Sequence, residues 1–124
     1  MAPRKRLSAD QSKLLPLTPA VFFVLFALAD GKKHGYAIMQ QVAALSSGQF
    51  RMGPGTLYTT IQRLVDLQLI EEIFSPDDVH DTRRRYYRLT GAGESLLETD
   101  LARMRSLLDT ARKLKLASPP WSWE

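Results

Sequence analysis

The sequence has 124 residues, which is enough for one domain with a modest core and too short for two. Lys and Arg outnumber Asp and Glu by 17 to 13, so the net charge is +4 and a polyanionic partner is favoured. The chain has no cysteine and only two histidines, which excludes disulfides and thiolate chemistry and argues against a zinc site or another cofactor. Because the absence of cysteine fits a reducing compartment, we expect a cytoplasmic protein.

The N-terminal segment, residues 1–13, is polar and basic and is interpreted as a flexible arm. It precedes an apolar run, Ala20 to Ala29, and this order superficially matches that of a secretory signal peptide. The basic cluster lies far from the apolar run, however, and the run is too short to span a membrane. We therefore expect a buried helix here and no contact with a membrane.

Capping residues define this first helix. Thr18 offers a side-chain cap, Pro19 suits the first helical position, and Asp30-Gly31 is a typical stop. Since the helix is apolar on every side, a monomer of this size leaves too little surface to cover it, and we expect a second subunit to do so. The apolar residues are Val21, Phe22, Phe23, Val24, Leu25, Phe26 and Leu28.

The second predicted helix begins near His34 and carries Ile38 and Val42 inward at helical spacing. The small and flexible residues 46–48 then end it. Residues 50–52 are predicted to form a short first strand before the third helix begins.

The third helix is predicted to begin at Gly53-Pro54, and it has one apolar and one polar face. Leu57, Ile61 and Leu64 share the apolar stripe. The polar side carries Thr, Gln and Arg, which can hydrogen-bond base edges, and Tyr58 sits at the boundary. An ordinary solvated helix face has the same pattern, so the following segment must decide between the two. The polar-face residues are Gly55, Thr56, Thr59, Gln62, Arg63 and Asp66.

A basic hairpin is predicted after this helix. Residues 71–75 and 84–89 form its strands, and residues 76–82 form the turn. In a winged helix such a hairpin follows the phosphate backbone or places an arginine in the minor groove, and Arg83 and Arg84 are the candidates. Charges on an edge strand can instead protect it from aggregation. The acidic tip, residues 76–81, moves the expected phosphate contact from the loop to the strand entrance.

A long last helix is predicted from Thr90, a plausible N-cap, to about Leu116. Its apolar residues recur at coiled-coil spacing, which favours a dimerisation helix over a core helix of a monomer. We expect this helix to meet the first helix of the partner subunit. A pocket for a small hydrophobic effector between the dimer arms is a further hypothesis, although a dry interface would contain the same residues. The dimer or effector-pocket residues are Phe22, Phe26, Leu97, Leu101, Met104 and Leu108.

Several spaced motifs resemble the PadR family of transcriptional regulators. They are His34-Gly35-Tyr36, Gly55-Thr56-Leu57-Tyr58, Arg63-Leu64, Leu69-Ile70 and the run from Arg85 to Gly93. The resemblance implies a dimeric winged helix-turn-helix regulator that binds a palindromic operator in double-stranded DNA, usually as a repressor. It also implies the smaller type of member, with a single C-terminal helix.

The resulting prediction is a mainly α fold with a small β-hairpin. The chain is divided into an arm (1–13), a winged helix-turn-helix domain (14–90), a C-terminal dimerisation helix (91–116) and a tail (117–124). The predicted DNA-binding residues combine the resemblance with the helix face and the hairpin, and they are Tyr36, Thr56, Tyr58, Thr59, Gln62, Arg63, Arg83, Arg84 and Arg85.

Two other functions compete with DNA binding. A winged helix can dock on a protein partner, with its arginines facing an acidic surface. An enzyme is disfavoured because neither His34 nor His80 has an evident nucleophile or paired carboxylate beside it. Asp77, Asp78 and Asp81 near His80 could hold a metal weakly, but polar loop tips are usually only solvated.

Overall fold

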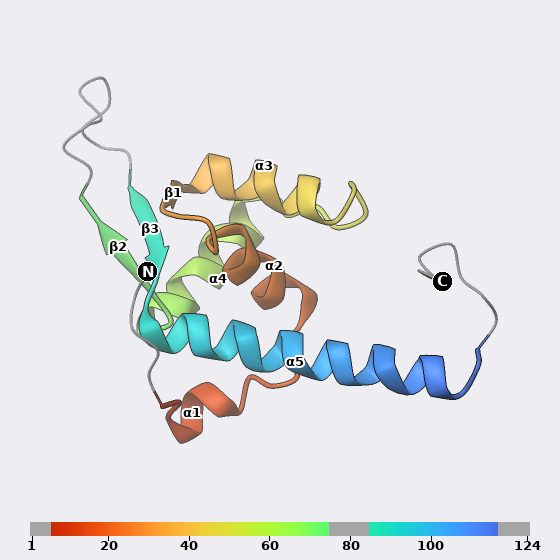
Figure 1. The fold of residues 1–124 in the computed structure, drawn as a ribbon. Coiled ribbons are helices and arrows are strands. Elements are labelled where there is room, and N and C mark those ends of the chain that lie inside the picture. Colours follow the sequence, from red (N-terminus) through yellow and green to blue (C-terminus); the bar gives the residue numbers. More distant parts are fainter. Residues whose placement is uncertain (1–5, 75–84, 117–124) are drawn as a thin grey trace.

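The computed structural model describes residues 6–74 and 85–116. In these residues the helices pack around one core, and a small antiparallel sheet lies at one end (Figure 1). The strand order is β1-β3-β2. The predicted mainly α winged-helix fold is therefore confirmed. The elements are α1 (Ala9–Ser12), α2 (Pro19–Ala27), β1 (Lys33–His34), α3 (Gly35–Leu45), α4 (Pro54–Asp66), β2 (Ile70–Ile73), β3 (Tyr86–Leu89) and α5 (Gly91–Lys113).

Helix α2 is the centre of the core. The Thr18 hydroxyl accepts a hydrogen bond from the Val21 amide at 3.4 Å, and Pro19 occupies the first turn, as predicted. Three helices of the same chain, α3, α4 and α5, cover most of this helix, which was predicted to need a second subunit for its cover. Val24 and Leu25 have no exposed surface. Phe23 and Phe26 are still partly exposed, so contact with a second subunit stays a prediction.

Residues 8–13 do not behave as the predicted flexible arm. The Ser8 and Gln11 side chains form a reciprocal capping box that holds α1. Gln11 is buried, and its Nε2 donates to the Leu67 carbonyl oxygen at 2.8 Å, so α1 is attached to the end of α4. The polar side chains of Ser8 and Gln11, which suggested a flexible arm, instead form hydrogen bonds with the backbone amides of this helical turn. Residues 1–5 lie outside the described part of the chain.

The first strand was predicted at residues 50–52 but lies at Lys33–His34, where it pairs with β3. The segment 50–52 packs into the core instead. Phe50 stacks on Phe23 with ring centroids 5.5 Å apart, and Met52 is buried. A strand of two residues has no hydrophobic periodicity of its own, so only its pairing with β3 reveals it.

Helix α5 begins against the sheet and then extends beyond the body of the domain (Figure 1). Thr90 caps it as predicted, accepting from the Gly93 amide at 3.0 Å. Buried Asp100 ties it to the start of α2, because its Oδ1 accepts from the Leu17 amide at 3.4 Å and from Arg103 Nε at 2.9 Å. The second half of α5 carries the exposed hydrophobic residues Met104 and Leu107, and exposed Leu114 is its C-cap.

Candidate nucleic-acid interface

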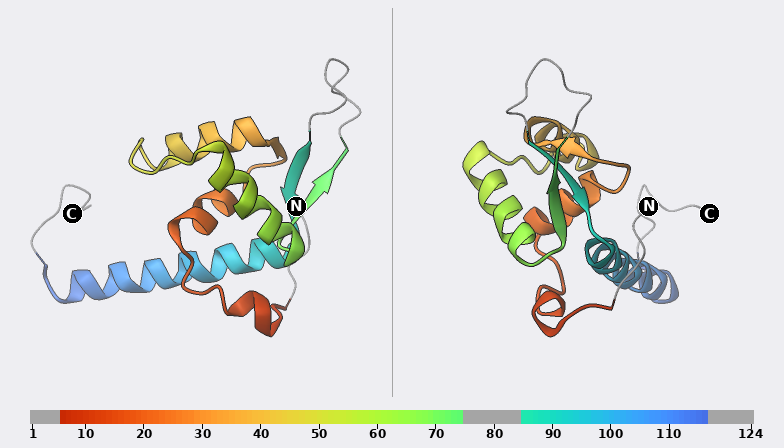
Figure 2. Two further views of the ribbon diagram at one scale, coloured as in Figure 1. Left: turned by 180° about the vertical axis from the view of Figure 1, so that it is seen from behind. Right: turned by 90° about the vertical axis from the view of Figure 1, so that its left-hand side faces the viewer.

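Helix α4 presents its predicted polar face to solvent. Leu57, Ile61 and Leu64 are buried, as their spacing predicted. The polar residues lie on the opposite side of the helix, and Figure 2 shows α4 on the outside of the bundle next to α3. Gly53 and Pro54 form the N-terminal boundary, as predicted. The exposed candidates on this helix are Thr56, Tyr58, Thr59, Gln62 and Arg63.

The start of α3 meets the first turns of α4. His34 is the N-cap of α3, and its Nδ1 accepts from the Ala37 amide at 3.2 Å. Tyr36 follows with 60% of its surface exposed, so it is free to contact a ligand. Gly35 is buried, and a Cβ there would come within 2.8 Å of Cζ of Tyr58. The two helices of the motif therefore touch through a glycine and a tyrosine.

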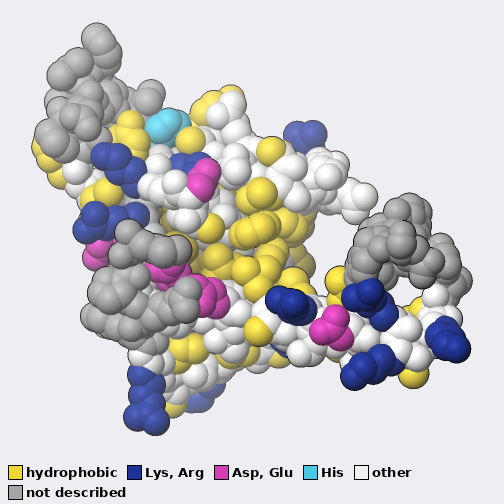
Figure 3. Space-filling model, viewed as in Figure 1, with side chains coloured by type: hydrophobic (Ala, Val, Ile, Leu, Met, Phe, Trp, Pro, Cys, Tyr) yellow, Lys and Arg dark blue, Asp and Glu magenta, His cyan; other side chains and the backbone are white. Residues whose placement is uncertain are grey.

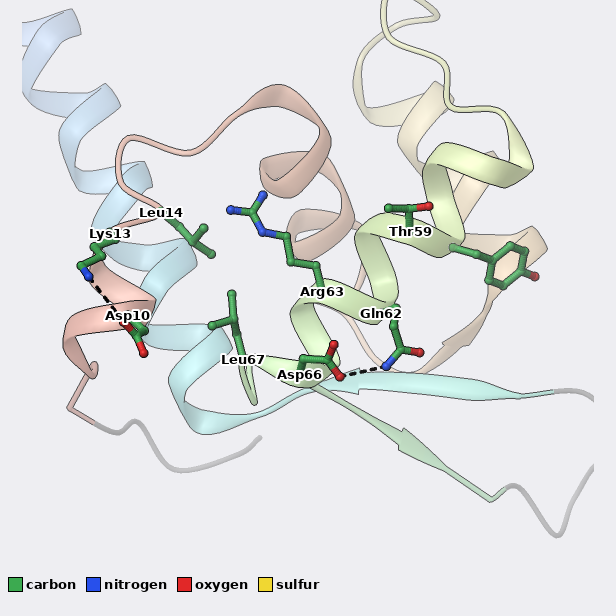
Figure 4. Close-up of a pocket in the computed structure, with 9 residues that line it drawn as sticks. Asp10, Lys13, Leu14, Thr59, Gln62, Arg63, Asp66 and Leu67 are labelled. Atoms are coloured by element: carbon green, nitrogen blue, oxygen red, sulfur yellow. Dashed lines mark hydrogen bonds and ion pairs between the residues drawn. The ribbon is translucent and has the colours of Figure 1, made fainter.

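A groove of about 840 Å³ lies along the exposed side of α4, with α1 as its other wall (Figure 4). Tyr58, Thr59, Gln62 and Arg63 all line it. Gln62 Nε2 donates to Asp66 Oδ1 at 2.9 Å, so its amide is partly engaged within the helix. Arg63 points from α4 toward the α1 side of the groove and has no ion pair with any residue in the described ranges. The positive charge of Arg63 is therefore not neutralised by a carboxylate of the described residues.

The wing arginines behave differently. Arg83 and Arg84 lie outside the described residues. Arg85 is exposed but lies 3.6 Å, Nε to Oε1, from Glu72 on β2. Arg88 Nε similarly donates to Glu71 Oε1 at 2.6 Å. Both arginines that the structure describes in the wing are therefore paired with a carboxylate of the neighbouring strand.

Tyr87 on β3 is buried. Burial raises the pKa of its phenol above the usual value, and the negative charge of Glu72 raises the pKa further, while the positive charge of Arg85 partly offsets this. The Tyr58 phenol is close enough to contribute to the same shift. The four side chains Tyr58, Glu72, Arg85 and Tyr87, here called the wing-root cluster, thus connect the wing to α4.

Sequence reasoning missed Glu72, Tyr87 and Arg51 as components of this surface. Glu72 and Tyr87 are direct partners in the strand register, so a correct alignment of β2 with β3 would have identified them. Arg51 is exposed two residues before the cap of α4 and has no ion pair with another described residue. Its position next to a helix N-terminus was the available signal.

The predicted dimer or effector-pocket residues fall into two groups. Phe22 and Leu97 are buried in the core of one chain, which corrects their assignment to an open pocket or interface. The other four side chains keep part of their surface exposed to solvent. Phe26, Leu101 and Leu108 are half-buried, and Met104 is exposed. Hydrophobic side chains gather in a hollow between α3 and α5, over α2 (Figure 3). The structure thus brings α2 and α5 of the same chain together, whereas the last helix was predicted to meet the first helix of the partner subunit.

The acidic turn that was considered as a weak metal site lies outside the described residues. Within the described ranges, the acidic residues and histidines form no cluster of three or more that could hold a metal ion. No helix in these ranges is long and apolar enough to span a bilayer.

A model of the transcriptional regulator PadR-like family matches residues 24–99, which is more than half of the chain. The chain belongs to this family. It is a PadR-like transcriptional regulator with a DNA-binding winged helix, and the family is one of regulators rather than enzymes. The match begins within α2 and includes α3, α4 and the wing, and α1 precedes it.

Two curated proteins illustrate the relationship. A stretch of 88 residues, 71% of this chain, is 40% identical to an uncharacterised 37.1 kDa protein in transposon TN4556 of Streptomyces fradiae, of which the match covers only 24%. Transcriptional regulator Rv3488 of Mycobacterium tuberculosis is 39% identical over 93 residues, and this match covers 73% of the present chain and 78% of Rv3488.

Solved structures share the fold. A PadR family regulator from Clostridium difficile superposes with a TM-score of 0.67 at 24% identity, covering 80% of this chain and all of that one. BpsR of Bordetella bronchiseptica, whose structure concerns the regulation of its DNA binding by 6-hydroxynicotinic acid, has a TM-score of 0.59 at 23% identity. That match covers 84% of this chain and 67% of BpsR.

Proposed function

We propose that this PadR-like regulator binds a palindromic operator as a homodimer and acts as a cytoplasmic repressor, with one α4 in the major groove of each half-site. The observation that carries the proposal is the exposed polar face of α4, on which Arg63 has no charged partner among the described residues. A structural arginine on a solvated face commonly pairs with a neighbouring carboxylate. An exposed unpaired guanidinium beside hydroxyl and amide groups suits a base edge or a phosphate.

The roles of the side chains follow from their chemistry. Thr59, Gln62 and Arg63 lie in successive turns of α4 and read base edges, Gln62 after release from Asp66. Tyr36 and Tyr58, at the junction of α3 and α4, donate to phosphates and set the register, and Thr56 lies on the same surface. Arginines 83–85 contact the backbone from the wing.

The dimer is formed through the exposed apolar side of α5 and the hydrophobic hollow over α2. Met104 and Leu107 are exposed on α5, and a helix with such a stripe is stabilised by a partner helix. A two-fold dimer places its half-sites about 34 Å apart, which is one turn of DNA. A palindromic operator follows from this symmetry.

A small hydrophobic effector would bind in the same hollow and release the operator. Phe26 and Leu101 are half-buried there on α2 and α5, so a ligand between them would change the angle between the dimer arms. BpsR, which has the same fold, has its DNA binding regulated by 6-hydroxynicotinic acid. Aromatic acids are therefore a reasonable first panel.

The test is footprinting of the DNA upstream of the protein's own gene, followed by titration of the protected duplex. Arg63→Ala is expected to lower discrimination at one base pair by about 1–3 kcal/mol. Arg105→Ala is the matched control, since it removes the same charge from the exposed side of α5. Equal affinities of the native protein for specific and random duplexes would contradict the proposal and favour docking on a protein.

A further inference from the structure

One face of the β2–β3 hairpin is turned toward the helices, and the other is turned away from them. Glu72 is the register partner of Tyr87, and Glu71 is the partner of Arg88. Because neighbouring residues of a strand point to opposite faces, Glu72 and Tyr87 share one face, and Glu71 and Arg88 share the other. Tyr87 is buried whereas Arg88 is exposed, so the face of Glu72 is the one turned toward the helices.

Glu71 does not line the groove along the polar face of α4. It lines a separate depression together with Arg6, Gln68 and Thr90, where the chain before α1 passes the start of α5. The Glu71–Arg88 pair therefore has the same chemistry as the Glu72–Arg85 pair but a different location. The chain thus contains a natural control for any effect of Glu72.

Glu72 and Arg85 lie on the strands next to the junction of α3 and α4. The Tyr58 ring packs against Gly35, which directly follows β1, and β1 pairs with β3 at Lys33 and Tyr87. Tyr58 also lines the groove along α4. A nucleic acid that contacts Tyr58 therefore passes close to this ion pair. Glu72 and Arg85 retain 47% and 71% exposure of their side chains, so the pair is accessible from that surface.

The carboxylate of Glu72 occupies the position at Arg85 that a phosphate oxygen would take. A phosphate at Arg85 must share the guanidinium with this carboxylate or displace it, and the negative charge of Glu72 repels the phosphates nearby. Both effects act on DNA of any sequence, because neither involves a base edge. The pair is exposed, so opening it costs little, and the effect is a graded reduction in affinity rather than a block.

We propose that Glu72 is an intramolecular competitor for the DNA phosphates at Arg85 and thereby lowers the affinity of the protein for duplexes in a sequence-independent way. The inference rests on the proposed function, since it requires Arg85 to face DNA. The cost applies equally to operator and random DNA, so it lowers both affinities by the same factor and leaves their ratio unchanged. Glu72 thus sets the overall affinity for DNA without touching a base.

The experiment measures binding of the full-length protein to a random-sequence duplex by fluorescence anisotropy at several salt concentrations. Glu72→Gln keeps the size of the side chain and removes its charge. It is expected to raise the affinity about two- to fivefold at low salt, the range that an exposed ion pair represents. The slope of log K against log salt should steepen by up to about 0.9, the value for one additional phosphate contact.

Three companion variants locate the effect. Glu71→Gln removes the same charge from the other face and is expected to leave the slope unchanged. Arg85→Ala should weaken binding, and Glu72→Gln in the Arg85→Ala background should restore less than half of the gain seen in the native background. A thermal melt of each variant shows that the folded state is retained.

The outcomes separate the two proposals. If Arg85→Ala weakens binding but Glu72→Gln has the native affinity and slope, the competitor role is wrong and the proposed function stands. Equal gains for Glu71→Gln and Glu72→Gln also overturn it, because net charge alone would then explain them. If the native protein binds no duplex, both proposals fail together.

Discussion

The phenol of Tyr58 on α4 occupies the space that a side chain at Gly35 on α3 would require. Cζ of Tyr58 lies 2.8 Å from the position of a Cβ at Gly35, closer than a real Cβ contact. Gly35 is not in a left-handed conformation, so this glycine is required by the close approach of a neighbour and not by its backbone angles. The absence of a side chain at Gly35 on α3 thereby leaves room for the Tyr58 ring on α4.

Gly35→Ala is expected to displace the Tyr58 ring with a change in unfolding free energy of at most about 1 kcal/mol, since half of the Tyr58 surface is exposed and its ring can move. DNA affinity should fall several-fold because Tyr58 loses its position. A double-mutant cycle with Tyr58→Ala, measured by DNA titration, checks this. Additive losses in the double variant would contradict the proposed coupling.

Gly93→Ala is expected to destabilise the protein by about 2–4 kcal/mol, because the new Cβ would meet the backbone carbonyl of Leu69, which cannot move like a side chain. That carbonyl oxygen also accepts from the Thr90 amide at 3.1 Å, so displacing it would disturb the start of α5. Urea unfolding measures the loss. A change below about 0.5 kcal/mol would show that α5 can shift away from β2.

Gly55→Ala should have effects of opposite sign on stability and binding. Nothing lies within 4 Å of a Cβ at Gly55, and alanine favours the helix, so stability is expected to rise by about 0.5–1 kcal/mol. Affinity for DNA should fall, since the added methyl group stands on the exposed start of α4, where the backbone approaches the duplex. Parallel urea and DNA titrations test this, and an unchanged affinity would place Gly55 outside the interface.

The Tyr87 phenol should ionise at a higher pH than an ordinary tyrosine, because burial and then the charge of Glu72 raise its pKa. The stability that comes from its folded-state pKa is present below the unfolded value of about 10 and is lost as the pH rises through the folded pKa. Tyrosinate absorbance against pH would report this, and Tyr87→Phe should remove a step that lies above the usual pH range of tyrosine. A titration curve unchanged in that range by Tyr87→Phe would contradict the raised pKa of Tyr87.

Met104→Glu should convert the dimer to monomers, since the exposed apolar side of α5 would then carry a charge at its centre. Ser106→Glu is the matched control, placing the same charge on an exposed polar position of α5. Sedimentation equilibrium gives the mass of each variant. If Met104→Glu retains the native mass while the native protein is dimeric, the interface lies elsewhere.

The local pattern of the chain determined its helices and the location of its polar surface. Thr18, Gly53 and Thr90 are helix caps at the positions where they were predicted, because capping depends on residues within one turn of each other. The apolar stripe of α4 was equally readable, since its period is that of the helix itself. Exposure of Thr59, Gln62 and Arg63 followed directly from that stripe.

Tertiary structure decided what depends on contacts between residues far apart in sequence. The burial of α2 within one chain, the attachment of Gln11 to Leu67 and the pairing of Arg85 with Glu72 all join separate elements. No local periodicity encodes such contacts, because strand register and helix packing are set by the whole core at once. The sequence alone thus determined which residues face solvent as a basic and polar surface, whereas only the packed chain decided which of those charges remain free to meet DNA.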